Sequence, residues 1–268
     1  EAELAQALKG VQALIVRSDK VGAQTIAQAD DLKIIVRAGA GYDNIDLEAA
    51  TKAGVVVMNT PGQNANAVAE LAIGLMIYMA RNQFNPSTGV EIAGKTLGIQ
   101  GFGNVGSLVA AKALALGMKV RAFDPVKSDE DMLVRGVEPT SSVKTLYADC
   151  DYISLNLPLV TVTERSVGYD LLSAMPKGGV LINTARKEIV DESGLERALE
   201  ERSDIKYASD VAPDNYAALR EKFGLRVYAN SKKMGAQTAE ANLNAGLAAA
   251  RQIVDYFETG NVKFQVNK

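Results

Sequence analysis

The chain has 268 residues, a length that allows two domains. It has 29 Lys and Arg against 32 Asp and Glu, so its formal net charge is −3. This balance, with a longest basic run of only Lys232-Lys233, argues against a nucleic-acid surface, and the apolar stretch 71–80 is far shorter than the roughly 20 residues that span a bilayer. No histidine and a single cysteine, Cys150, argue against a zinc site and an internal disulfide, so we expect a cytoplasmic protein without a metal.

Short apolar runs alternate along the chain with Ala- and Leu-rich helical stretches, which is the rhythm of βαβ units in a parallel sheet. The expected strands are 13–16, 34–36, 55–57, 97–99, 119–123, 152–155, 180–182 and 207–209. Three of them precede a long expected helix, 66–81, one leads into a glycine-rich turn, and the other four follow that turn. A last amphipathic helix, 239–257, is long enough to cross back to the first domain.

A domain boundary is expected near residue 63, because the preceding segment 59–62 contains the proline and glycine of a linker. The sequence therefore predicts an α/β fold with two domains, one of residues 1–63 and 240–268 and the other of residues 64–239. The second domain is expected to be a doubly wound parallel sheet.

One motif carries a specific chemistry. It is the G-x-G-x-x-G turn Gly101-Phe102-Gly103-Asn104-Val105-Gly106, which lies between an apolar strand and an Ala-rich helix. Gly101 permits a tight turn, Gly103 lets the backbone approach a pyrophosphate, and Gly106 lets the helix pack closely on the strand. The pyrophosphate would meet the free N–H groups and the positive dipole at the helix N-terminus.

The flanks of this turn strengthen the interpretation, because an ordinary strand-to-helix bend would use similar glycines. Asp124 lies eighteen residues after Gly106 and ends the expected strand 119–123. There its carboxylate can accept hydrogen bonds from the adenosine ribose hydroxyls. Because the carboxylate would also repel a 2′-phosphate, the sequence predicts NAD as the cofactor rather than NADP.

Several further segments occur together in one order and at matching distances, namely 14–21, 36–46, 58–62, 94–98, 182–186 and 235–238. Over nearly its whole length the chain resembles the D-2-hydroxyacid dehydrogenase family, and in particular its short phosphoglycerate dehydrogenases without a regulatory domain. The resemblance implies a flavodoxin-like substrate domain and a Rossmann domain, joined by two crossings, with the active site in the cleft. It also implies a homodimer through the Rossmann domains, involving the helix 66–81.

Two departures from the family are evident. The family begins with a strand and a helix before the strand at 13–16, so we expect a fragment rather than a sheet with an unpaired edge. The family's acid–base histidine stands two residues before Gly235, and that position is Lys233. The position of its glutamate partner is Asn215, and Asp214 lies one residue out of register. Which of these two replaces the glutamate stays open.

A lysine can replace the histidine if its pKa falls. An ordinary lysine has a pKa near 10.4 and a useful general base needs roughly 7 to 8, a difference of about 4 kcal/mol. A nearby glutamate would raise the pKa, whereas burial beside Arg186 and the positive nicotinamide ring would lower it. The resemblance extends to a subgroup of short phosphoglycerate dehydrogenases that carry lysine here. We therefore expect Lys233 to be the proton carrier, the alternative being an inactive scaffold that still binds NAD.

Arg186 is the second expected catalytic residue. It follows the strand 180–182 at the carboxyl end, where open α/β sheets bind ligands. Its guanidinium could hold the substrate carboxylate and the C2 oxygen together and polarise the forming carbonyl. Lys187-Glu188 stand where the family has two glycines, which leaves the local turn open.

The resemblance assigns the remaining site residues. The expected cofactor-binding residues are Gly101, Gly103, Asn104, Val105, Gly106, Asp124, Asn156, Pro158, Thr163, Thr184, Ala185, Asp210, Gly235 and Ala236. Among them, Asp210 matches the residue that holds the nicotinamide carboxamide. The expected substrate-binding residues are Arg17, Ser18, Lys20, Arg37, Ala38 and Gly39, whose charges and backbone N–H groups suit a substrate with an anion at each end.

These observations favour an NAD-dependent enzyme that oxidises 3-phospho-D-glycerate to 3-phosphohydroxypyruvate in serine biosynthesis. Two alternatives remain. The first is another D-2-hydroxyacid dehydrogenase, or a reductase of glyoxylate, hydroxypyruvate or another 2-oxo acid. The second is a non-catalytic NAD-binding sensor or corepressor-like protein on the same scaffold.

Overall fold

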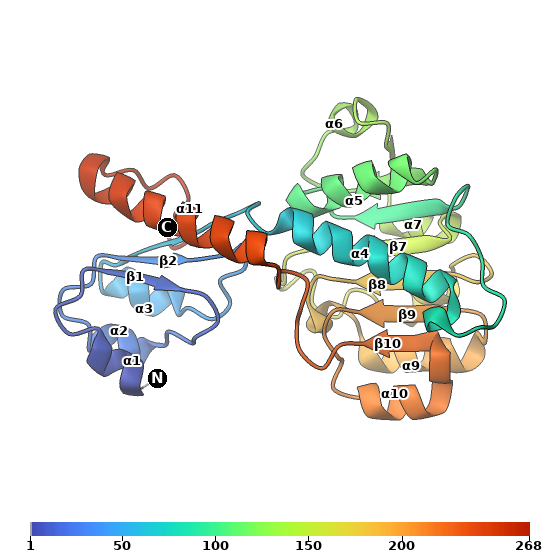
Figure 1. Cartoon of the computed structure of the whole chain (residues 1–268), viewed down its shortest axis with the longest axis horizontal. Coiled ribbons are helices and arrows are strands. Elements are labelled where there is room, and N and C mark those ends of the chain that lie inside the picture. The colour runs from blue at the N-terminus through green and yellow to red at the C-terminus, as the bar shows by residue number, and fades with distance from the viewer. Residues whose placement is uncertain (1) are drawn as a thin grey trace. The chain divides into compact units, whose positions relative to one another are not determined.

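The computed structural model describes residues 2–268. They form two compact units, which are residues up to Ala65 with Gln237–Lys268 (unit 1) and Asn66–Ala236 (unit 2) (Figure 1). The first boundary thus falls after Ala65 rather than after residue 63, and the second falls before Gln237 rather than after residue 239. Within the described part of the chain, no helix is long and apolar enough to cross a membrane.

Unit 2 contains a parallel sheet of seven strands in the order β10-β9-β8-β7-β4-β5-β6. The strands are β4 (Thr96–Gln100), β5 (Lys119–Phe123), β6 (Glu138–Pro139), β7 (Tyr152–Leu155), β8 (Val180–Asn183), β9 (Lys206–Ser209) and β10 (Val227–Ala229). From β4 the chain first proceeds outward to β5 and β6, then returns to β7 on the other side. The strand order therefore reverses between β4 and β7, the point at which doubly wound sheets bind their ligands.

Helices cover both faces of this sheet (Figure 1). They are α4 (Ala65–Ala80), α5 (Asn104–Ala115), α6 (Asp129–Leu133), α7 (Val143–Asp149), α8 (Tyr169–Ser173), α9 (Glu192–Glu201) and α10 (Tyr216–Phe223). Three single turns, η1 (Asn82–Phe84), η2 (Lys187–Ile189) and η3 (Gly224–Arg226), link them. Every residue of the inner strands β7 and β8 is buried, because helices cover both faces of the sheet.

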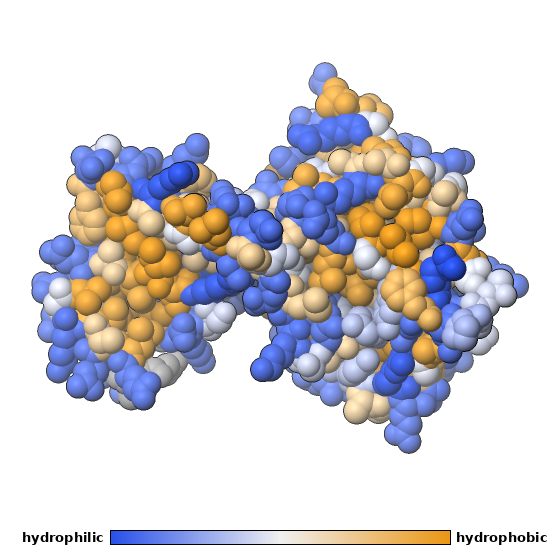
Figure 2. Space-filling view, viewed as in Figure 1, coloured by the Kyte–Doolittle hydropathy of each residue, from blue (hydrophilic) through white to orange (hydrophobic). Residues whose placement is uncertain are grey.

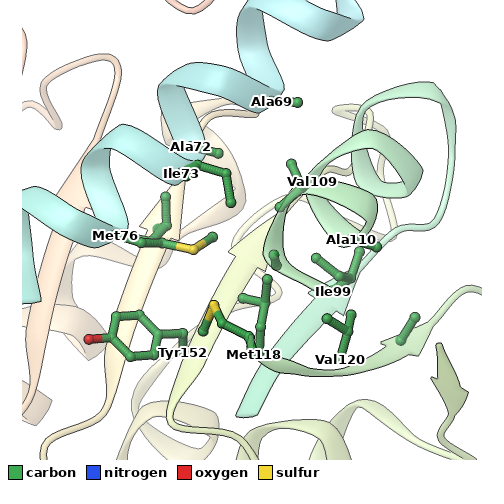
Figure 3. Close-up of a cluster of buried hydrophobic side chains, with 14 of the residues drawn as sticks. Ala69, Ala72, Ile73, Met76, Ile99, Val109, Ala110, Met118, Val120 and Tyr152 are labelled. Atoms are coloured by element: carbon green, nitrogen blue, oxygen red, sulfur yellow. The ribbon is translucent and has the colours of Figure 1, made fainter. Parts of the chain in front are cut away.

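The core of unit 2 has two halves, one on each face of the sheet. In the first, small side chains of α4 and α5 let these helices approach β4 and β5, and Ala69, Ala72, Val109 and Ala110 meet Ile99 and Val120 there (Figure 3). In the second, α7, α8 and α9 bury Leu146, Leu172 and Leu195 against β7 and β8. The two halves fix the sheet from both sides and hold the carboxyl ends of its strands at one edge.

Unit 1 is built on a parallel sheet in the order β1-β2-β3, made of β1 (Ala13–Val16), β2 (Ile34–Arg37) and β3 (Val56–Asn59). The helices α1 (Ala2–Ala7), α2 (Ala23–Ala27) and α3 (Leu47–Lys52) accompany these strands, and α11 (Ala239–Thr259) packs on β1 and β2. Apolar residues gather over β1 and β2 on the face shown in Figure 2. Ile15 of β1 keeps 44 % of its surface exposed.

Candidate active site and cofactor cradle

The glycine turn forms a tight connection from β4 to α5. Gly101 has φ +91°, and a Cβ there would lie 2.6 Å from the Asn156 carbonyl oxygen. A Cβ at Gly106 would lie 2.1 Å from the Gly101 oxygen, so α5 can pack against the turn only with glycine at this position. A Cβ at Gly103, by contrast, would meet no heavy atom within 4 Å. The space over Gly103, at the N-terminus of α5 with Asn104 and Val105, is therefore free for a pyrophosphate.

Asp124 lies directly after β5 and fastens this turn to its neighbour. Its Oδ2 accepts the Phe102 N–H at 2.7 Å, and its Oδ1 accepts the Val126 N–H at 2.8 Å. A carboxylate offers about four acceptor positions, so two remain for ribose hydroxyls.

Among the buried polar atoms that have no hydrogen-bond partner in the described residues, two belong to residues that directly follow β7 and β8. They are Asn156 Oδ1 and Thr184 Oγ1, and Thr184 is 5 % exposed. The Asn156 amide group donates to Ser154 instead, at 3.1 and 3.2 Å. Buried polar groups normally have partners, so these orphaned atoms, with the space over Gly103, fit a bound dinucleotide.

A cavity of about 680 Å³ opens at the carboxyl ends of β4, β5 and β7. Gln100, Phe123, Pro125, Leu157 and Thr163 contribute to its lining, whereas Arg186 and Lys233 do not. The Thr163 hydroxyl donates to the Pro158 carbonyl at 2.6 Å and so shapes the loop after β7. Two lining residues, Phe123 and Pro125, flank Asp124 in the sequence, so the cavity suits the adenosine half of a dinucleotide.

The two expected catalytic residues meet at one carbonyl group. The Ala185 oxygen accepts Arg186 Nη1 at 3.0 Å and Lys233 Nζ at 2.5 Å. The turn that presents this carbonyl is held by the buried Asn183, which accepts the Ala185 N–H at 3.0 Å and donates to the Arg186 oxygen at 2.9 Å. The structure therefore gathers Arg186 and Lys233 at the ends of β8 and β9.

Asp210, at the end of β9, is completely buried and contacts the lysine directly. Its Oδ1 lies 3.2 Å from Lys233 Nζ, and its Oδ2 accepts the Gly235 N–H at 2.9 Å. Lys233 therefore has a carboxylate partner, Asp210, which is neither of the two residues considered for the glutamate's place. Ala236 follows Gly235 at the end of this unit.

Burial of the ammonium group lowers the pKa of Lys233 below its ordinary value. Asp210 opposes this effect, the positive charge of Arg186 adds to it, and Glu188 weakly opposes it. The direction is the one that a general base needs. Desolvation outweighs the attraction of Asp210 even though 40 % of the lysine side chain is exposed.

The two candidates for the missing glutamate are engaged elsewhere. The Asp214 carboxylate pairs with Lys187, one of the two residues that replace the family's glycines. The backbone N–H groups of Asp214 and Asn215 donate to Glu192 at 2.8 and 3.2 Å, and Asn215 Oδ1 is buried without a partner in the described chain. Neither residue has a hydrogen bond to Lys233.

The expected substrate residues lie in unit 1 at the carboxyl ends of β1 and β2. Arg37 Nε donates to the Arg17 oxygen at 3.1 Å, which joins the two strand ends. Gly39 has φ +151°, and a Cβ there would overlap the Arg37 guanidinium. Arg17 is half-buried and Ala38 is buried, while Ser18 and Lys20 are exposed. This end of unit 1 thus presents guanidinium and ammonium groups together, as an anion site requires.

Sequence reasoning missed three features of the site, which are the Ala185 carbonyl as an acceptor for both cations, the bracing role of Asn183 and the bond from Asp210 to Lys233. The residues concerned are far apart in the chain, with 48 positions separating Ala185 from Lys233. No pattern in the sequence marks a backbone carbonyl as an acceptor for a distant amine.

Comparison with known proteins agrees with this architecture. Residues 70–223 match the family model described as D-isomer specific 2-hydroxyacid dehydrogenase, NAD binding domain. The crystal structure of cofactor (NAD+) bound 3-phosphoglycerate dehydrogenase from Entamoeba histolytica is similar, with a TM-score of 0.94 and 47 % identity over 100 % of this chain and 86 % of that one.

Two curated relatives are also similar. Hydroxypyruvate reductase of Thermotoga maritima is 38 % identical over 94 % of this chain and 86 % of its own length. D-3-phosphoglycerate dehydrogenase of Methanocaldococcus jannaschii is 36 % identical over 94 % of this chain but only 51 % of its own length, so the chain spans about half of that relative. The chain belongs to the D-isomer specific 2-hydroxyacid dehydrogenases, a family of NAD-dependent enzymes, and unit 2 contains the family's NAD-binding domain.

Proposed function

We propose that this protein oxidises 3-phospho-D-glycerate at C2 to 3-phosphohydroxypyruvate, a step of serine biosynthesis. The observation that carries the proposal is that Arg186 and Lys233 both donate to the Ala185 carbonyl. This carbonyl lies at the same edge of the sheet as the glycine turn, since both follow the carboxyl ends of parallel strands. The similarity to the two 3-phosphoglycerate dehydrogenases supports the choice of substrate.

In this proposal Arg186 binds the substrate carboxylate and the C2 oxygen, so that the C2 hydrogen is held toward the cofactor. Lys233, as the neutral amine, accepts the proton of the C2 hydroxyl. NAD, when bound, accepts the hydride. As negative charge develops on the C2 oxygen, Arg186 stabilises it.

The cofactor-binding roles are assigned as follows. Gly101, Gly103, Gly106, Asn104 and Val105 receive the pyrophosphate, and Asp124 receives the ribose hydroxyls. The remaining contacts come from Asn156, Pro158, Thr163, Thr184, Ala185, Asp210, Gly235 and Ala236. The unpaired atoms of Asn156 and Thr184 support this assignment, because a bound cofactor would supply their missing hydrogen bonds.

We assign the phosphate to Arg17, Ser18, Lys20 and Arg37, and the nearby N–H groups of Ala38 and Gly39 to an anionic group of the substrate. The Ala38 N–H donates to the Val16 oxygen and the Gly39 N–H to the Arg37 oxygen, both at 2.8 Å, so anion binding there would depend on displacing these bonds. The side chains are therefore the stronger part of the assignment.

Reduction of hydroxypyruvate or glyoxylate is the second candidate, and the Thermotoga maritima relative favours it because this chain spans 86 % of that enzyme. The two candidates differ in the phosphate. An unphosphorylated acid has no phosphate for Arg17, Lys20 and Arg37 to bind.

A substrate panel separates these functions. NADH absorbance would be followed with 3-phosphoglycerate, D-glycerate and D-lactate, and then with the corresponding oxo acids. We expect the highest kcat/KM for the phosphorylated pair. A clear preference for hydroxypyruvate would support the second candidate, and NADH binding without turnover of any acid would indicate a sensor.

We further propose a cytoplasmic homodimer formed through unit 2. Phe84 keeps 68 % of its surface exposed and packs edge-on against Tyr78 of α4, with ring centroids 5.0 Å apart. An apolar ring at the end of α4 suits a protein interface. Light scattering would compare the mass in solution of the Phe84→Asp variant with that of the unchanged protein. We expect the variant to have the mass of one chain, and a variant that keeps the mass of a dimer would contradict the proposal.

A further inference from the structure

Asp210 is a fully buried carboxylate whose hydrogen bonds both go to one short segment. Its Oδ1 takes Lys233 Nζ at 3.2 Å and its Oδ2 takes the Gly235 N–H at 2.9 Å. We infer that Asp210 is a positioning residue that holds the Lys233 amine and its loop for the reaction, in place of the family's glutamate. The inference rests on the proposed function, since it serves the step in which Lys233 accepts the proton.

The charges of Asp210 and Lys233 balance each other. A buried carboxylate is costly unless it is paired and hydrogen-bonded, and the Lys233 ammonium group supplies both. The backbone N–H of Gly235 satisfies the second oxygen. The pair therefore stabilises each partner where it lies, and the lysine cannot swing away without leaving the Asp210 charge buried alone.

The loop at Gly235 also fits closely against Asp210. A Cβ at Gly235 would lie 2.7 Å from Asp210 Oδ2, so the glycine lets the loop come close enough for its N–H to reach the carboxylate. Asp210 itself is fixed by β9 and by its own N–H, which donates to the Asn183 oxygen at 3.1 Å. One rigid strand end thereby sets the position of the amine.

No other carboxylate of the described residues contacts the Lys233 amine. The Asp214 carboxylate is paired with Lys187, and Asn215 has no charge. Glu188 acts on Lys233 only through its charge and has no hydrogen bond to it in the described structure. Asp210 is the acid that contacts the amine.

The charges around the amine fix the expected sign. Asp210 from β9 and Glu188 from the segment after β8 raise the pKa of Lys233, while burial and Arg186 lower it. Replacing Asp210 by asparagine removes a raising influence, so the pKa of Lys233 should fall further. The neutral amine would then be present at lower pH, and oxidation would reach its plateau at lower pH.

The test compares Asp210→Asn with Asp214→Asn, a matched loss of one carboxylate four positions along the chain. In Asp210→Asn we expect the midpoint of kcat/KM against pH to move down by roughly one unit, the order expected for losing an opposite charge in contact. We also expect a lower kcat, because the amine is no longer held. Asp214→Asn should leave the midpoint in place. An unmoved midpoint in Asp210→Asn, or equal shifts in both variants, would overturn the inference.

A second readout needs no substrate. Reductive methylation of Lys233, followed by peptide mass spectrometry across a pH series, reports the fraction of neutral amine. Half-maximal reactivity should occur at lower pH in Asp210→Asn than in the unchanged protein and in Asp214→Asn. If this shift appears while no hydroxy acid is turned over, the pair is supported and the proposed function fails. If turnover is normal and reactivity is unshifted, the function stands and the inference fails.

Lys233→Met provides a reciprocal check should Asp210→Asn not fold. Without the ammonium group the Asp210 charge is buried unpaired, so the free energy of unfolding should fall relative to the unchanged protein. A free energy of unfolding that is the same in Lys233→Met and in the unchanged protein would count against the pair.

Discussion

Lys233 is the side chain on which the proposed chemistry depends. Lys233→Ala should lower kcat by roughly 10²- to 10⁴-fold, the usual loss for a missing general acid or base. NADH binding should change less than kcat, since the glycine turn and Asp124, to which the pyrophosphate and the ribose are assigned, keep their contacts. Steady-state kinetics and fluorescence titration with NADH measure the two effects.

Lys233→Arg is the matched control for this prediction. It keeps the positive charge beside Asp210, but a guanidinium does not deprotonate at any working pH, so turnover should not recover. Full activity in Lys233→Ala would show that the proton goes elsewhere, and restored activity in Lys233→Arg would show that only charge is needed.

Asp124 is the residue that we expect to favour NAD over NADP. Asp124→Ala should weaken NAD binding by roughly tenfold, since a charged acceptor for the ribose hydroxyls is lost together with the bonds to Phe102 and Val126. Binding of NADP should be weakened less, because repulsion of the 2′-phosphate is relieved. Asp129→Ala, at the start of α6, should affect neither. Comparable rates with NAD and NADP in the unchanged protein would remove the claim.

The turn between β4 and α5 separates packing from ligand binding. Gly106→Ala places a methyl group 2.1 Å from the Gly101 oxygen, so α5 must move and stability should fall by roughly 1–3 kcal/mol. Gly103→Ala meets no protein atom within 4 Å and has φ −82°, which suits alanine. Its stability should change by less than about 0.5 kcal/mol, while NAD affinity falls at least about tenfold.

Thermal unfolding with and without NAD distinguishes these two variants. Gly106→Ala should unfold at a lower temperature without ligand. Gly103→Ala should match the unchanged protein without ligand but gain less from NAD, because a bound ligand stabilises in proportion to its affinity. An undiminished gain in Gly103→Ala would mean that the space over this glycine is not used by the cofactor.

The strands β5 and β7 were predicted with the limits that the structure shows. β7 is buried along its whole length, whereas β5 alternates between buried and more exposed residues, and either pattern indicates a strand when turns bound it. The helices α4 and α11 differ from expectation by one or two residues at their ends. The expected strands lack β6 and β10, two edge strands of two and three residues that are too short to carry a period.

The candidate site divides in the same way. Glycines and the acid after a strand have local geometric reasons that can be found in a sequence, so the turn at Gly101 and Asp124 could be anticipated. The contact of Asp210 with Lys233 depends on the loop after β10, which reaches the end of the neighbouring strand β9. The carbonyl shared by Arg186 and Lys233 depends on how Asn183 bends its turn. Such contacts are set by tertiary structure and have no signature in one sequence.

The residues assigned to the phosphate belong to unit 1, and the residue assigned as proton carrier belongs to unit 2. The two sets of residues should therefore have separable kinetic effects. Arg17→Ala should raise KM for 3-phosphoglycerate by roughly 10- to 100-fold, the effect of losing one charged hydrogen bond. The KM for D-glycerate, which has no phosphate, should change far less, and kcat should fall less than in Lys233→Ala.

Lys9→Ala serves as the control for Arg17→Ala, because Lys9 is an exposed cation of unit 1 outside the strand ends. It should leave both KM values unchanged, which separates a local contact with the phosphate from a general loss of positive charge. If Arg17→Ala raises the KM of both acids equally, the Arg17 side chain has a role other than binding the phosphate. In that case the phosphate would have to be sought at Lys20 and Arg37, by the same pair of substrates.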